Sequence, residues 1–71
     1  MSNFLNEQIK INFSVPPGLK EYMDYAEKAD KDNDAGNYYA YIDAIDTIAK
    51  NCYATGSITK EMQIIISQRY H

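Results

Sequence analysis

The chain of 71 residues has no tryptophan, one cysteine and one histidine. The single cysteine, Cys52, excludes an intramolecular disulfide framework and is typical of a reducing compartment, so we expect a cytoplasmic protein. The longest aliphatic run is three isoleucines at 64–66, whereas a membrane helix needs about 20 apolar residues. The first seven residues lack a basic region followed by an apolar run, so we expect neither a signal peptide nor a membrane partner.

Motifs that carry catalysis are also missing. The sequence has no phosphate-binding glycine loop, no dinucleotide fingerprint and no serine nucleophile elbow. Aspartates at 30, 32 and 34 begin like a calcium loop, but the glycine comes one residue late. In addition, Tyr41 stands where the bidentate glutamate belongs. We therefore predict that the protein is not an enzyme and has no catalytic residue, cofactor or metal site.

The stretch 37–55 has the period of a central helix on which the rest of the chain packs. Asn37 is the predicted N-cap, and Gly56 stands where a left-handed residue ends a helix. Asp46 and Lys50 form an i,i+4 pair on the polar side. The residues on the apolar stripe are Tyr38, Tyr41, Ile42, Ile45, Ile48, Ala49, Cys52 and Tyr53.

Two further helices are predicted, over 17–30 and 60–70. Pro17 suits the first turn of the former, and Thr59 is a good N-cap for the latter. Ile64 points away from the inward face of the last helix. The fold class is therefore mainly α, in one small helical domain over 1–71 that begins with a strand or arm.

Residues 9–15 alternate strictly between apolar and polar side chains, which predicts a β-strand over about 8–15. The chain offers no second strand, and a lone strand leaves its backbone groups unpaired. It must pair with another copy, pair with a partner protein, or lie as an arm against the helices. We expect pairing between the subunits of a homodimer, with Ile9, Ile11, Phe13 and Val15 as interface candidates.

The net charge of −3 is uneven, since the segment 20–46 carries eight acids and three lysines. This acidic middle favours a protein partner with a basic surface over the phosphate backbone of DNA. Seven tyrosines are the other unusual feature. Most fit the edge of a core, but Tyr39 falls on the polar side of the central helix, so it joins Ile64 as an interface candidate.

Two stretches resemble known proteins. Residues 9–29, IKINFSVPPGLKEYMDYAEKA, resemble the opening of ribbon-helix-helix repressors, in which paired strands enter the DNA major groove. That resemblance makes Lys10, Asn12 and Ser14 candidate DNA contacts. The chain departs from this family at the acidic DKDND and in having a third helix. Residues 49–61 are similar to small uncharacterised proteins of Firmicute phages and mobile elements, a resemblance that implies no activity.

Three functional classes follow. The first is a small interaction protein, phage- or mobile-element-encoded, that regulates or inhibits a host protein. The second is a DNA-binding transcriptional regulator of the ribbon-helix-helix kind. The third is a nucleotide-binding or sequestering protein, in which bases would stack on tyrosines.

Overall fold

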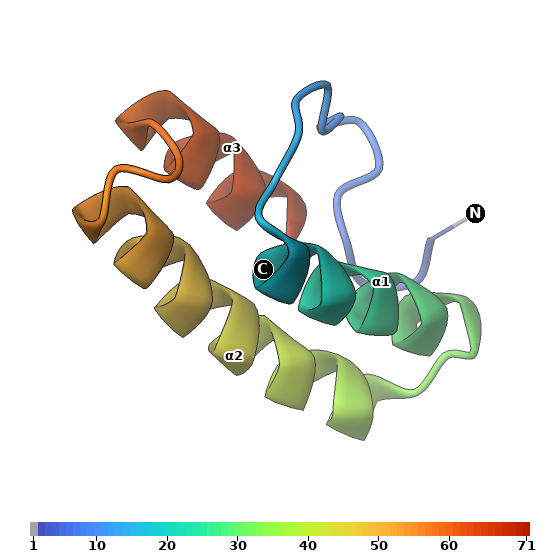
Figure 1. The fold of residues 1–71 in the computed structure, drawn as a ribbon. Helices are drawn as coiled ribbons and strands as arrows, with labels where there is room; N and C mark the ends of the chain where they lie inside the picture. The colour runs from blue at the N-terminus through green and yellow to red at the C-terminus, as the bar shows by residue number, and fades with distance from the viewer. Residues whose placement is uncertain (1) are drawn as a thin grey trace.

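A computed structural model describes residues 2–71, in which three helices follow an irregular N-terminal segment (Figure 1). Helix α1 spans Pro17–Lys31, α2 spans Ala35–Ala54 and α3 spans Lys60–Arg69. Helix α2 contacts both other helices, which confirms the prediction of a mainly helical fold with a central helix. None of the helices in this described part of the chain is long and apolar enough to cross a bilayer.

Local capping explains where most of the helices begin and end. Thr59 accepts a hydrogen bond from the Met62 amide at 3.1 Å and so caps α3, as predicted. Gly56, with a φ of +82°, follows α2 in the left-handed conformation that glycine adopts at no steric cost. The predicted cap of α2 was wrong. Asp34, not Asn37, caps this helix, because its carboxylate accepts from the Asn37 amide at 3.3 Å.

The predicted strand over 8–15 is not formed: residues 2–71 contain no β-strand. Residues 2–16 instead run as an irregular segment, which we call the N-terminal arm. A strand is defined by its backbone hydrogen bonds to a neighbour, and a single chain with one alternating segment has no neighbour to supply them. The described residues before this alternating segment are also held in place, because Leu5 is buried in the core.

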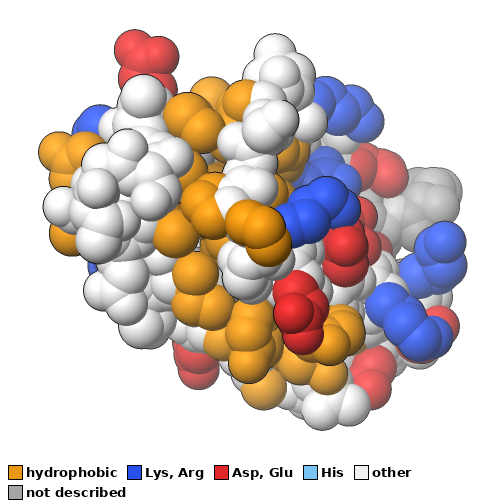
Figure 2. All heavy atoms as spheres, viewed as in Figure 1, with side chains coloured by type: hydrophobic (Ala, Val, Ile, Leu, Met, Phe, Trp, Pro, Cys, Tyr) orange, Lys and Arg blue, Asp and Glu red, His pale blue; other side chains and the backbone are white. Residues whose placement is uncertain are grey.

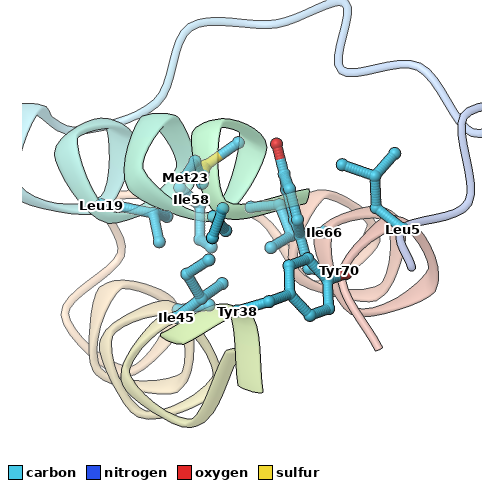
Figure 3. Packing of buried hydrophobic residues seen from close by; sticks show 11 residues of the cluster. Leu5, Leu19, Met23, Tyr38, Ile45, Ile58, Ile66 and Tyr70 are labelled. Carbon is cyan, nitrogen blue, oxygen red and sulfur yellow. The ribbon is translucent and has the colours of Figure 1, made fainter. Parts of the chain in front are cut away.

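The core lies where the three helices and the arm converge (Figure 3). Its largest fully buried side chains are Leu19 of α1, Tyr38 and Ile45 of α2, and Ile66 of α3. Leu5 of the arm and Tyr70, just after α3, complete the cluster from the two ends of the chain. A core drawn from every element means that no helix is stabilised by its own sequence alone.

The buried hydroxyl of Tyr38 leads to a testable prediction about the stability of the core. Its ring is fully buried, yet within residues 2–71 its hydroxyl has no hydrogen-bond partner. Burial, followed by the nearby Asp30 carboxylate, raises the pKa of Tyr38 to about 12, and the backbone of His71 lowers it slightly without forming a hydrogen bond of acceptable geometry. An unpartnered buried hydroxyl costs about 1–3 kcal/mol. We therefore expect Tyr38→Phe to raise the free energy of unfolding at pH 7 by about 1 kcal/mol, as measured by urea denaturation.

The same variant has a signature at alkaline pH. The pKa of Tyr38 is higher in the folded than in the unfolded chain, so the folded state loses stability once the pH rises above about 10. Tyr38→Phe should lose less stability than the parent chain between pH 9 and 11. A variant less stable than the parent at pH 7 would mean that the hydroxyl has a partner after all.

Candidate interaction surface

Burial alternates along residues 9–15 in the structure, as the sequence pattern predicted, although these residues do not form a strand. Ile9, Ile11, Phe13 and Val15 are half-buried, and Ile11, Phe13 and Val15 pack against the core. Lys10, Asn12 and Ser14 are exposed. The segment therefore has one apolar side and one polar side, as a strand at the edge of a sheet would have.

The backbone of residues 10–15 is open. Among the described residues, none of its N–H or C=O groups takes part in a hydrogen bond, whereas the carbonyl of Ile9, one residue earlier, accepts one. Six consecutive residues with free donors and acceptors form a template on which another extended chain can pair. We call residues 10–15 the open stretch.

The open stretch arches away from α1 (Figure 1). A cleft of about 770 Å³ lies between this stretch and the helices. The apolar lining comes from Ile11, Phe13 and Val15 of the arm and from Met23 of α1. In the space-filling view, hydrophobic side chains gather beside the arm, while most charged side chains lie toward the right (Figure 2). The apolar side of the arm is therefore only partly covered by its own chain.

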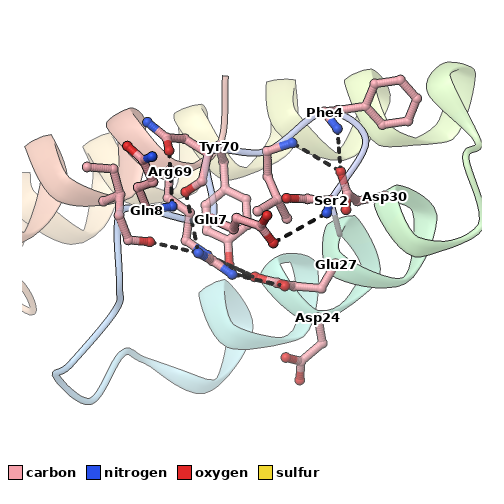
Figure 4. Close-up of polar contacts among 12 residues, drawn as sticks. Ser2, Phe4, Glu7, Gln8, Asp24, Glu27, Asp30, Arg69 and Tyr70 are labelled. Atoms are coloured by element: carbon pink, nitrogen blue, oxygen red, sulfur yellow. Dashed lines mark hydrogen bonds and ion pairs between the residues drawn. The ribbon is translucent and has the colours of Figure 1, made fainter.

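Asp30 holds the beginning of the arm in place. One oxygen of this buried carboxylate accepts from the amides of Asn3, Phe4 and Leu5 at 3.0, 2.6 and 3.0 Å (Figure 4). Three donors directed at one charged oxygen compensate for taking it out of water. The carboxylate thereby fixes where the chain enters the core.

Arg69, in the last turn of α3, holds the arm further along. Its Nη1 donates to the carbonyl of Ile9 at 2.7 Å, and its Nε and Nη2 donate to the Glu27 carboxylate at 2.9–3.2 Å. The Tyr70 hydroxyl also donates to Glu27, and burial with this hydrogen bond raises the pKa of Tyr70. We call Glu27, Arg69 and Tyr70 the clamp (Figure 4). The carbonyl of Ile9 is the last backbone group of the arm that the clamp binds, and the open stretch begins at the next residue.

A cluster of tyrosine rings lies across α1 and α2, away from the clamp. The rings of Tyr25 and Tyr41 are 5.4 Å apart, and Tyr22 lies 5.7 Å from the first and 6.3 Å from the second. Tyr25 is 43 % exposed, which fits the prediction that most of the tyrosines lie at the edge of the core. Its hydroxyl donates to Glu21 at 2.8 Å, which keeps the ring at the surface.

The other predicted interface residues are exposed but lie away from the open stretch. Tyr39 is 51 % exposed and its ring stacks near those of Phe4 and Tyr38, while Ile64 is 45 % exposed on α3. Neither lines the cleft beneath the open stretch. Among the predicted DNA contacts, Lys10 and Ser14 line that cleft, whereas Asn12 does not.

Sequence reasoning missed Asp30 and the clamp, since it considered Asp30 only as a position of a calcium loop and did not name Arg69 as a site residue. Each binds residues 25 to 63 positions away, so no local pattern pointed to them. In the part of the chain that the structure describes, no three His, Cys, Asp or Glu side chains are grouped closely enough to hold a metal ion.

Comparison with known proteins leaves function to be argued from these features alone, because the chain matches no family model, no curated protein and no solved structure.

Proposed function

We propose that this protein is a non-enzymatic interaction protein that pairs with a second copy through the open stretch and, as a dimer, regulates or inhibits a protein partner with a basic surface. The observation that carries the proposal is the open stretch itself. Its backbone groups are unpaired along six residues, and its apolar side chains are only half-covered. An exposed strand-like edge is a liability in a chain that works alone.

A second copy is the partner that fits this stretch best. Two copies related by a two-fold axis would lay residues 10–15 antiparallel, so that each supplies the hydrogen bonds that the other lacks. The same pairing would cover the half-buried Ile11, Phe13 and Val15. In the cleft of about 770 Å³ beneath the arm, Met23 of α1 provides an apolar contact for those side chains.

Sedimentation at micromolar concentration tests the pairing. We expect a dimer of twice the 8.1 kDa chain mass. Ile11→Pro, which removes an N–H from the middle of the open stretch, should dissociate it to monomers. Asn12→Ala, which removes an exposed side chain but keeps the backbone, should leave the dimer intact. A parent chain that sediments only as an 8.1 kDa species would rule out the dimer at that concentration.

The charges that remain outside ion pairs favour a basic partner. Four ion pairs engage four of the seven bases: Lys20–Asp24, Lys28–Asp32, Lys50–Asp46 and Arg69–Glu27. Within residues 2–71, six acids and three lysines are left over, and of those acids only Asp30 is buried. A surface with this excess of acids attracts a cationic protein surface and repels phosphate.

DNA binding is the second candidate, because Lys10, Asn12 and Ser14 are exposed side by side on the open stretch. A dimer would present two such rows, as the resemblance to ribbon-helix-helix repressors implies. Each row has only one positive charge, however, so we favour the protein partner. A salt-dependent, sequence-specific shift of DNA at nanomolar protein would reverse this preference.

A further inference from the structure

We propose that the tyrosine cluster includes a binding site for one arginine side chain of the basic partner. The site is a hollow of about 140 Å³ between the end of α1 and the beginning of α2. Ligand pockets for whole small molecules measure about 300–1,000 Å³, so this hollow has room for the head of one side chain. The existence of a basic partner is taken from the function proposed above. The residues that line the hollow are Tyr25, Lys28, Ala29, Asp32, Asp34, Asn37 and Tyr41.

The lining combines aromatic rings with carboxylates. The rings of Tyr25 and Tyr41, 5.4 Å apart, offer negatively polarised faces to a cation. Asp34 uses its carboxylate to cap α2, and Asp32 holds Lys28 through only one oxygen, Oδ2, at 3.0 Å. The Lys28–Asp32 pair is exposed, so a competing cation displaces it at little cost. The planar guanidinium of arginine both stacks on a ring and forms paired hydrogen bonds with a carboxylate, which the ammonium of lysine does not.

The cation–π contacts of other tyrosines in the chain support the binding of an external cation at Tyr25 and Tyr41. Two other tyrosine rings already have one: the Lys60 Nζ lies 5.0 Å from the centroid of Tyr53, and the Arg69 guanidinium lies 5.6 Å from that of Tyr70. No lysine or arginine of residues 2–71 is placed in this way over Tyr25 or Tyr41, although acids surround them. The lining of the hollow holds two carboxylates and one cation, Lys28, which pairs with Asp32 and is not placed over either ring.

The test is an NMR titration of the full chain with three capped amino acids: arginine, lysine and citrulline. Citrulline has nearly the shape of arginine but no charge. We expect arginine to give saturable shifts of the Tyr25 and Tyr41 ring signals, lysine to bind more weakly and citrulline to give no saturable shift. Shifts from arginine no larger than those from citrulline, or equally large at Tyr53, would overturn the proposal.

Variants locate the binding in the hollow. Tyr25→Leu keeps an apolar side chain but removes the ring, and it should weaken arginine binding about two- to fivefold. Asp32→Asn removes the charge of the carboxylate that has a free oxygen, and it should weaken binding by a similar factor. Tyr53→Leu is the control on another exposed tyrosine and should have no effect; unchanged binding in the first two variants would overturn the site. Sedimentation of the same samples measures whether the protein is a dimer. The dimer and the arginine site can therefore be disproved independently of each other.

Discussion

Ile45→Ala is expected to lower the free energy of unfolding by about 2–4 kcal/mol, because it removes buried methyl groups and leaves a cavity. Ile45 is 2 % exposed and lies on α2, the helix that contacts both others. Domains of this size are stable by roughly 5 kcal/mol, so the loss should consume much of the total. In a thermal melt it corresponds to a fall in Tm of about 10–30 °C.

Thr47→Ala is the matched control for that prediction, two residues further along the same helix. Thr47 is exposed, and its hydroxyl donates only to the carbonyl of Asp43, one turn earlier. Alanine is the better helix former, so the variant should change stability by less than about 0.5 kcal/mol. If denaturant melts ranked the two variants in the opposite order, the buried face of α2 would have been assigned wrongly.

Arg69→Met is expected to cost about 2–3 kcal/mol and to loosen the arm. The variant keeps an apolar stem of similar length but leaves the carbonyl of Ile9 and the Glu27 carboxylate without the guanidinium. Removing one partner of a buried ion pair costs about 3–5 kcal/mol; the figure is lower here because Glu27 is 39 % exposed. Hydrogen exchange should show the amides of Asn6 and Ile9 losing more protection than those at the centre of α2.

Lys50→Met provides the comparison, since it also removes a cation from an ion pair. The Lys50–Asp46 pair spans 2.9 Å, but its side chains are 64 % and 50 % exposed. Exposed pairs of this kind contribute about 0–1 kcal/mol, so little change is expected. Equal losses in Arg69→Met and Lys50→Met would show that the clamp contributes no more than a surface ion pair.

The role of the clamp bears on the proposed dimer. Asp30 and Arg69 fix residues 3–9 against the helices, and the hydrogen bonds end at the carbonyl of Ile9. Residues 10–15 are therefore anchored at both ends, by the clamp at Ile9 and by α1 from Pro17, which lowers the entropy lost when a partner strand pairs with them. Arg69→Met should weaken the dimer as well as the fold.

The helices could be foreseen because their causes are local. An apolar stripe at the helical period, a proline in a first turn, Thr59 as a cap and Gly56 after a last turn are each specified within a few residues. The exposure of Tyr39 and Ile64 followed from the same geometry. Where two residues that can cap a helix lie close together, as Asp34 and Asn37 do, the pattern led to the wrong one, Asn37.

The sequence by itself determined that the fold is mainly helical, with α2 at its centre, and that residues 9–15 have one apolar and one polar side. Only the tertiary structure decided the course of the arm, the burial of Asp30 and the formation of the clamp. The physical reason is distance along the chain: Asp30 binds residues 25 to 27 positions earlier, and Arg69 binds Glu27 and Ile9 from 42 and 60 positions away. Contacts of that range depend on how whole helices pack, which a pattern of neighbours along the chain does not encode.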